Sequence, residues 1–182
     1  SGHWKRHAVA RIALTQADVP TALPAAVGVA TTIPPSDFYT ALRRTGAYHG
    51  QAFAALTRIV RTTGGPTETE IVLPDEATPY RGAVLHPVML DAALQTLAAA
   101  MPEELLSESS EVTYLPVAME SIRVFGDIGR RARCRAELVS IAEGGGDAVG
   151  QVTLMDDSGT PIAAVTGVYL RRVQRRTVPL PL

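Results

Sequence analysis

The sequence HPVMLDAALQTLAAAM, residues 86–101, is the most apolar helical stretch of the chain. At 100° per residue its apolar side chains cover nearly every face, which predicts a helix that is buried on all sides rather than an amphipathic surface helix. One carboxylate, Asp91, lies in the middle of this stretch. Because a buried carboxylate is costly unless it is paired, hydrogen-bonded or protonated, Asp91 should either face a cavity or water or be held there for chemistry.

The composition indicates a soluble globular protein. The chain has 182 residues, 46% of them hydrophobic and 19% charged, and a net charge of −1. This balance argues against nucleic acid or an anionic membrane as a partner. The single cysteine, Cys134, excludes an internal disulfide and cysteine-based zinc sites. The histidines and carboxylates show no metal-ligand spacing either, and there is no membrane span or signal peptide, so we expect a cytoplasmic protein without a metal.

Capping and turn residues divide the first half of the chain into short elements. The sequence SDFYTALRRTG, residues 36–46, predicts a helix with Ser36 as its N-cap and Gly46 just beyond its end. Strands are predicted over 54–62 and 67–73, joined by a Gly-Gly-Pro turn. Before the helix, residues 4–14 alternate like a strand, and 15–35 have the composition of a linker.

The final third is rich in strand signals. A strand is predicted near 119–125, and 131–142 alternates between inward and outward side chains. Two hairpins follow at EGGGD and DDSGT, and the glycines of the first form a turn rather than a phosphate loop because no helix follows. The side chains expected inward are Ala132, Cys134, Ala136 and Leu138, and those expected outward are Arg131, Arg133, Arg135 and Glu137. An antiparallel sheet wrapped around one apolar helix is an α+β, hot-dog-like architecture.

Three blocks of sequence resemble one protein family. They are FYTALRRTGAYHGQAFAAL (38–56), HPVMLDAALQ (86–95) and YLPVAMESIRVFG (114–126). In this order and spacing they resemble the C-terminal half of dehydratase domains of modular type I polyketide synthases, from about residue 36 to 173. The resemblance implies a double hot-dog fold with 36–175 as its second hot dog and 176–182 as a tail. Residues 1–14 would then be the last strand of the preceding hot dog, or a tag.

The resemblance also implies a reaction, the dehydration of a 3-hydroxyacyl thioester to an α,β-unsaturated acyl chain. Asp91 matches the catalytic aspartate of the family, and Gln95 matches the residue one turn later that hydrogen-bonds near it. The catalytic histidine of the family lies in an HxxxGxxxxP motif of the first hot dog, and this chain has no such motif. The base is therefore expected from an N-terminal half outside this chain.

Residue chemistry agrees with an acid role for Asp91. A hydroxide leaving group needs a proton as its bond breaks, and a carboxyl group can give one at neutral pH only where desolvation disfavours its ionised form. An apolar helix is expected to do this. Gln95, at i+4, should meet Asp91 on one helix face and orient it.

The expected substrate-binding positions surround these two residues. The family pattern of tyrosine, glycine and proline in the first block is replaced here by His49, Gly50 and Gln51, so His49 is a candidate to replace the tyrosine. His86 has a second interpretation, as a cap at the helix N-terminus. The arginines of 130–135 are interpreted as a solvated strand face or, alternatively, as a docking patch for an acidic carrier protein. The full set of expected substrate-binding residues is His49, Gly50, Phe53, His86, Pro87, Leu90, Tyr114, Leu115 and Pro116, of which the last three shape a tunnel wall.

The implied partners are an acyl carrier protein, whose phosphopantetheine arm carries the substrate, and the N-terminal hot-dog half. No cofactor is expected in this domain, and NADP would serve other domains of a lipid or polyketide synthase. Two alternatives stay open. One is a non-catalytic half that binds an acyl chain or mediates dimer contacts. The other is a standalone hot-dog thioesterase or hydratase that works as a homodimer.

Overall fold

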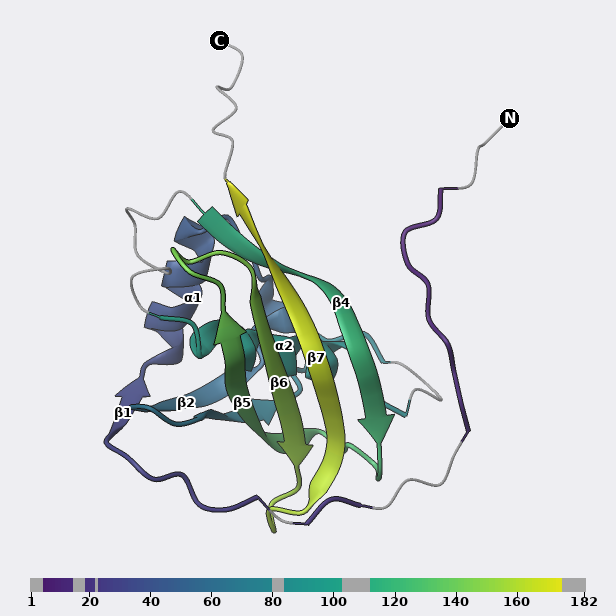
Figure 1. Cartoon of the computed structure of the whole chain (residues 1–182). Coiled ribbons are helices and arrows are strands. Elements are labelled where there is room, and N and C mark those ends of the chain that lie inside the picture. Colours follow the sequence, from purple (N-terminus) through teal and green to yellow (C-terminus); the bar gives the residue numbers. More distant parts are fainter. Residues whose placement is uncertain (1–4, 15–18, 22, 80–83, 103–111, 175–182) are drawn as a thin grey trace.

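The chain folds as one antiparallel sheet with a helix held in its concave side (Figure 1). The computed structural model describes residues 5–14, 19–21, 23–79, 84–102 and 112–174. The sheet has seven strands in the order β1-β2-β3-β5-β6-β7-β4, and each neighbouring pair is antiparallel. The strands are β1 (Ala30–Ile33), β2 (Leu56–Thr62), β3 (Thr67–Val72), β4 (Val112–Val124), β5 (Arg131–Ile141), β6 (Ala148–Met155) and β7 (Pro161–Gln174). The helices are α1 (Pro35–Arg44), η1 (Gln51–Phe53) and α2 (Pro87–Ala99). The predicted hot-dog fold is confirmed.

Helix α2 is the centre of the core, as its sequence predicts. It packs against β2, β3, β5 and β6, and most of its side chains are buried. Only Pro87 is exposed, while a stripe of half-buried residues runs along one side of the helix: Leu90, Asp91, Leu94 and Ala98. The helix is therefore enclosed by the sheet except along this stripe.

Two contacts set the position of α2. Gly150 of β6 lies against the helix so closely that a Cβ atom there would collide with the Leu97 side chain and lie 3.0 Å from the carbonyl oxygen of Glu137. At the far end of the helix, the Arg61 guanidinium donates hydrogen bonds to the carbonyl oxygens of Ala99 at 2.6 Å and Met101 at 3.2 Å. These carbonyls have no partner within the helix, so Arg61 satisfies them.

The N-terminal part differs from its predicted structure. The predicted strand over 4–14 is wrong, because residues 5–14 have no regular secondary structure and are exposed (Figure 1). The linker prediction for 15–35 is wrong at its end, where β1 pairs with β2 and adds a strand to the sheet. The alternation of apolar and polar residues over 4–14 did not lead to a strand, because a strand needs a partner to pair with. Among the described residues, no strand of this chain pairs with this segment.

Two element boundaries also shifted. Helix α1 begins two residues earlier than predicted, with Pro35 as its first residue and Pro34 in place of Ser36 as the N-cap. Proline suits this position because the first turn of a helix needs no N–H donor. Strand β4 starts at Val112 rather than near 119, since it lies at the edge of the sheet, where Pro116 is tolerated beside a break in register. The acidic segment 103–111, expected as a loop, lies outside the described residues, as do 176–182.

The prediction of a solvated face on β5 is wrong for Arg135. It is only 7% exposed, although it lies on the outer face of the sheet. Its guanidinium donates to Glu68 Oε1 at 2.6 Å and to the carbonyl oxygen of Pro24 at 2.6 Å. The segment before β1 thus covers Arg135, whereas Arg131 and Arg133 are exposed as expected.

Candidate active site

A mainly apolar pocket of about 180 Å³ lies along the half-buried stripe of α2. Its walls come from the end of α1 and the segment after it, from α2, and from the start of β4. Polar groups enter it at His49, Asp91 and Gln95. The other lining residues are Leu42, Thr45, Ala47, Leu94, Ala98, Met101, Thr113, Tyr114, Leu115 and Pro116. An apolar cavity with a few convergent polar groups is the usual form of a small-molecule site.

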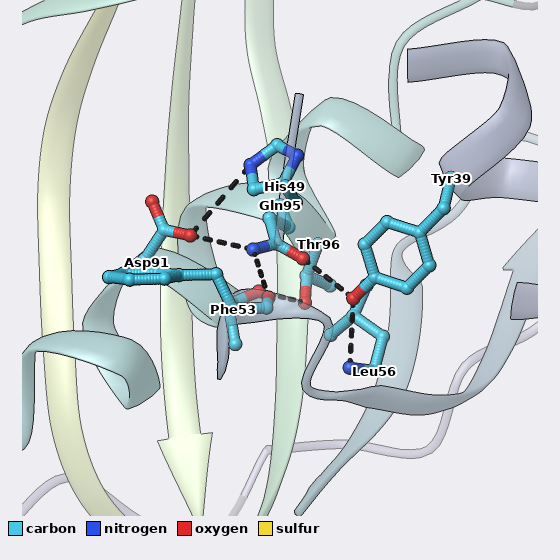
Figure 2. A network of polar contacts seen from close by, with 8 residues as sticks. Tyr39, His49, Phe53, Leu56, Asp91, Gln95 and Thr96 are labelled. Carbon is cyan, nitrogen blue, oxygen red and sulfur yellow. Dashed lines mark hydrogen bonds and ion pairs between the residues drawn. The ribbon is translucent and has the colours of Figure 1, made fainter. Parts of the chain in front are cut away.

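Asp91 and Gln95 lie one turn apart on α2 and meet at the pocket (Figure 2). Gln95 Nε2 donates to Asp91 Oδ2 at 2.6 Å, so the two side chains have the contact expected from their i+4 spacing. Gln95 is buried, with 3% of its surface exposed. The Asp91 side chain is 36% exposed. Of the two alternatives for Asp91, the structure shows the first, since the carboxyl group faces the pocket on the one side of α2 that the sheet leaves open. The apolar helix alone does not desolvate it as expected.

Tyr39 of α1 joins this pair and was missed by the sequence analysis. Its hydroxyl donates to Gln95 Oε1 at 2.8 Å and accepts from the backbone N–H of Leu56 at 3.1 Å. The second N–H of the Gln95 amide donates to the carbonyl oxygen of Phe53 at 2.9 Å. Burial raises the pKa of Tyr39 to about 12. The only signal in the sequence was its place next to Phe38 in a helix with clear start and stop residues. That place does not distinguish a core tyrosine from a site residue.

His49 lies on the other side of Asp91. Its Nε2 atom is 3.8 Å from Asp91 Oδ2, and its ring centroid lies 6.1 Å from that of Tyr39. The Nδ1 atom is buried and has no hydrogen-bond partner among the described residues. The structure therefore brings His49 to the pocket next to the predicted acid.

His86 caps the N-terminus of α2, as the second interpretation of this residue predicts. It is the N-cap of α2, and its Nδ1 accepts from the backbone N–H of Val88 at 3.2 Å. Its Nε2 lies 3.0 Å from the carbonyl oxygen of Thr78. Neither His86 nor the following Pro87 lines the pocket. The predicted substrate contact at both is not supported by their position.

The remaining predicted positions divide into two groups. Tyr114, Leu115 and Pro116 line the pocket from β4, and the Tyr114 hydroxyl donates to the carbonyl oxygen of Gly145 at 2.6 Å, which ties the pocket wall to the β5–β6 turn. Gly50, Phe53 and Leu90 do not line it. Of these, Phe53 takes part through its backbone carbonyl, whereas its side chain is 41% exposed.

The described residues form neither a metal cluster nor a membrane-spanning helix. Within the described ranges, histidine, cysteine, aspartate and glutamate side chains form no group of three or more that could hold a metal ion. No helix in the described part of the chain has the length and apolar character needed to cross a membrane.

Comparison of sequences connects this geometry to known proteins. A family model described as "Polyketide synthase dehydratase N-terminal domain" matches residues 17–179. A phenolphthiocerol/phthiocerol polyketide synthase of Mycobacterium tuberculosis (strain CDC 1551 / Oshkosh) is 51% identical over 183 residues, which cover all of this chain and 10% of that protein. Polyketide synthase GfsE of Streptomyces halstedii is 33% identical over 145 residues, covering 79% of this chain and 4% of that protein.

Solved structures agree with the sequence matches. The dehydratase domain of PpsC from Mycobacterium tuberculosis, in complex with C12:1-CoA, superposes with a TM-score of 0.72 at 32% identity and covers 84% of this chain. The dehydratase domain from the CurJ module of curacin polyketide synthase has a TM-score of 0.69, covers 79% of this chain and, at 18% identity, supports the fold alone. The chain spans 56% of the PpsC structure and 50% of the CurJ structure, about half of each. By sequence and by fold, the chain belongs to the polyketide synthase dehydratase family.

Proposed function

We propose that this chain is the second hot dog of a polyketide synthase dehydratase and supplies the acid of the reaction. The substrate is a 3-hydroxyacyl thioester on the phosphopantetheine arm of an acyl carrier protein, and the products are water and an α,β-unsaturated acyl chain. The observation that carries the proposal is the Asp91 carboxyl group, held by Gln95 on the wall of an apolar pocket. The bound C12:1-CoA of the PpsC dehydratase supports an acyl chain as the ligand of such a pocket.

In the proposed reaction a base removes a proton from the α-carbon while the Asp91 carboxylic acid protonates the departing hydroxyl group. The C–O bond breaks, the α,β double bond forms and water departs. Asp91 is then a carboxylate. General acid catalysis of this kind contributes about 10²–10⁴-fold in rate. The reaction is redox-neutral, so it requires no nicotinamide cofactor in this domain, and NADP would serve other domains of the parent synthase.

The base is proposed to come from an N-terminal hot-dog half of the same dehydratase. Among the described histidines, His86 is engaged at the N-terminus of α2. His49 lies on the same side of the site as the acid, 3.8 Å from it, and is proposed to replace the family tyrosine as a hydrogen-bond donor toward the substrate. Docking of the N-terminal half over the open stripe of α2 would also remove Asp91 from water, which is the condition for an acid role.

A second candidate function is a non-catalytic half that binds an acyl chain or mediates dimer contacts. The 36% exposure of the Asp91 side chain in this chain favours it for the isolated fragment. For either function, we propose that the parent protein works in the cytoplasm and that its partner is an acyl carrier protein.

The test is turnover of a 3-hydroxyacyl carrier protein, followed by mass spectrometry as loss of water. We expect no turnover by this chain alone and turnover when the N-terminal half is supplied. Asp91→Asn should abolish turnover by the pair, and Asp157→Asn, which changes an exposed aspartate in a turn, should leave it unchanged. Turnover by the chain alone would overturn the proposal that the base comes from the N-terminal half. Failure of the intact pair, with Asp91→Asn indistinguishable from it, would favour the non-catalytic function.

A further inference from the structure

Tyr39 has a role in the site that its packing does not explain. It comes from α1, outside the helix that carries Asp91 and Gln95, and its hydroxyl is enclosed between Gln95 and the start of β2 (Figure 2). Its ring also packs edge-on against Phe38 at 5.4 Å between centroids. The ring and the hydroxyl can therefore be separated by experiment.

The direction of each hydrogen bond in this network is fixed by two backbone groups. The Leu56 N–H can only donate, so the Tyr39 oxygen accepts from it and the single hydroxyl proton goes to Gln95 Oε1. The Phe53 carbonyl can only accept, so it faces Gln95 Nε2. Both ends therefore require the same orientation of the amide, with oxygen toward Tyr39 and nitrogen toward Phe53.

This orientation determines what Gln95 offers to Asp91. The remaining N–H of Nε2 points to Asp91 Oδ2, at 2.6 Å. An oxygen that accepts from this N–H cannot at the same time direct its own proton at Nε2. In a neutral carboxylic acid the carbonyl oxygen is the stronger acceptor, so the short contact with Nε2 favours Oδ2 as the carbonyl oxygen and Oδ1 as the oxygen that carries the proton.

We propose that Tyr39 is a positioning residue for the dehydration, which fixes the Gln95 amide so that Asp91 Oδ2 only accepts and Oδ1 carries the proton that is transferred. The inference rests on the proposed function. In the reaction the Oδ1–H bond breaks as the new O–H bond of the leaving water forms, and Asp91 becomes a carboxylate. The Gln95 N–H, already in place on Oδ2, then stabilises that charge.

The environment of Tyr39 suits a permanent donor. Its pKa, raised to about 12 mainly by burial, keeps the hydroxyl protonated throughout the pH range in which a dehydratase works. The titratable groups that face Asp91 across the site are Tyr39 and His49. Of these, only Tyr39 is hydrogen-bonded to Gln95 among the described residues.

The first test uses this 182-residue chain without substrate. In NMR spectra the Gln95 side-chain amide should give two well-separated proton signals, because its N–H groups meet a carboxylate and a carbonyl. Tyr39→Phe keeps the ring and removes the hydroxyl, and we expect the Gln95 signals to move together and broaden. Tyr169→Phe is the matched control, since the Tyr169 hydroxyl also donates a side-chain hydrogen bond, to Glu120 Oε1 at 2.7 Å, but lies on the exposed side of the sheet away from Gln95. Unchanged Gln95 signals in Tyr39→Phe would overturn the proposal.

The second test is a double-mutant cycle on the chain supplied with its N-terminal half. Tyr39→Phe should lower kcat about tenfold with little change in KM, because misplacement of an acid costs rate rather than binding. In a Gln95→Leu background the same substitution should have no further effect, since Tyr39 acts through Gln95. An equal loss in both backgrounds would show a packing role and overturn the proposal. Changed NMR signals without any dehydration by the intact pair would retain the Tyr39–Gln95 coupling and reject the proposed function instead.

Discussion

Cys134 shows how completely the core on the sheet side of α2 is closed. Its side chain is fully buried on β5, and beside it Thr96 and Thr69 share a hydrogen bond of 2.7 Å between their hydroxyl oxygens. Burial raises the pKa of the Cys134 thiol to about 12, although a hydrogen bond with Thr96 opposes this. A thiol in such surroundings forms almost no thiolate near neutral pH.

We therefore expect Cys134 to be inert in the folded protein. A disulfide reagent such as 5,5′-dithiobis(2-nitrobenzoic acid) should release no colour from the native chain and one equivalent per chain after unfolding in denaturant, since the sequence has one cysteine. Rapid labelling of the native chain would mean that β5 opens locally far more often than this packing implies.

The residues of the site differ in how far the sequence could reveal them. Asp91 and Gln95 share a helix face at i and i+4, so their contact follows from local geometry alone. Tyr39 lies 56 residues before Gln95, and no local pattern brings these two together. The burial of Arg135 was not predicted for a similar reason, because the Pro24 carbonyl that helps to bury it comes from a segment 111 residues away. Side chains whose partners are distant in sequence require the fold.

Among the elements, β6 approaches α2 at Gly150, where there is no room for a side chain. Gly150→Ala would place a methyl group into the Leu97 side chain and against the Glu137 carbonyl. We expect it to lower the free energy of unfolding by about 1–3 kcal/mol, as overpacking of a core does. Denaturant unfolding measures this. Gly129→Ala, where an added Cβ meets nothing within 4 Å, is the control and should be close to neutral.

Combining Gly150→Ala with Leu97→Ala separates overpacking from a backbone effect. The second substitution removes the side chain that the new methyl group would meet. The cost of the double variant should therefore be smaller than the sum of the two single costs. Additive costs would place the effect in the β6 backbone.

The turn of the β6–β7 hairpin is stabilised by hydrogen bonds to the Asp156 carboxylate, and this stabilisation depends on pH. Asp156 Oδ1 accepts hydrogen bonds from the Ser158 hydroxyl at 2.6 Å and from the backbone N–H groups of Ser158 and Thr160, each at 2.9 Å. These bonds, that of the Ser158 hydroxyl first, hold the pKa of Asp156 below its ordinary value. A carboxyl group with a lowered pKa in the folded state stabilises the fold above the pKa of the unfolded state and loses this contribution as the pH falls.

Asp156→Ala should therefore lower the melting temperature at about pH 7, and the difference from the natural chain should shrink toward about pH 3. Thermal unfolding followed by circular dichroism across this range measures the effect. Asp157→Ala, which changes the neighbouring exposed aspartate, should show a much smaller difference. A difference for Asp156→Ala that stays constant with pH would assign the effect to chain flexibility at the turn rather than to the carboxylate.

For the whole molecule, the sequence predicted the central helix, both hairpins and the hot-dog class, since each depends on a local period or turn. It did not predict β1, whose four residues have no alternation long enough to detect, or the first part of β4, where Pro116 interrupts the pattern. Both strands lie at the ends of the sheet. Edge strands tolerate residues that a central strand does not, so their sequence signals are weaker.

The two ends of the sheet are unequal, and this matters for handling the protein. One end closes with the four-residue strand β1, whereas the other ends with the thirteen residues of β4, which within the described residues pairs only with β7. Leu115, Val117 and Ile122 are each about half exposed along β4. A long open strand edge with exposed apolar side chains is a template for self-association. Solubility, rather than resistance to unfolding, should therefore set the concentration at which this chain can be studied in isolation.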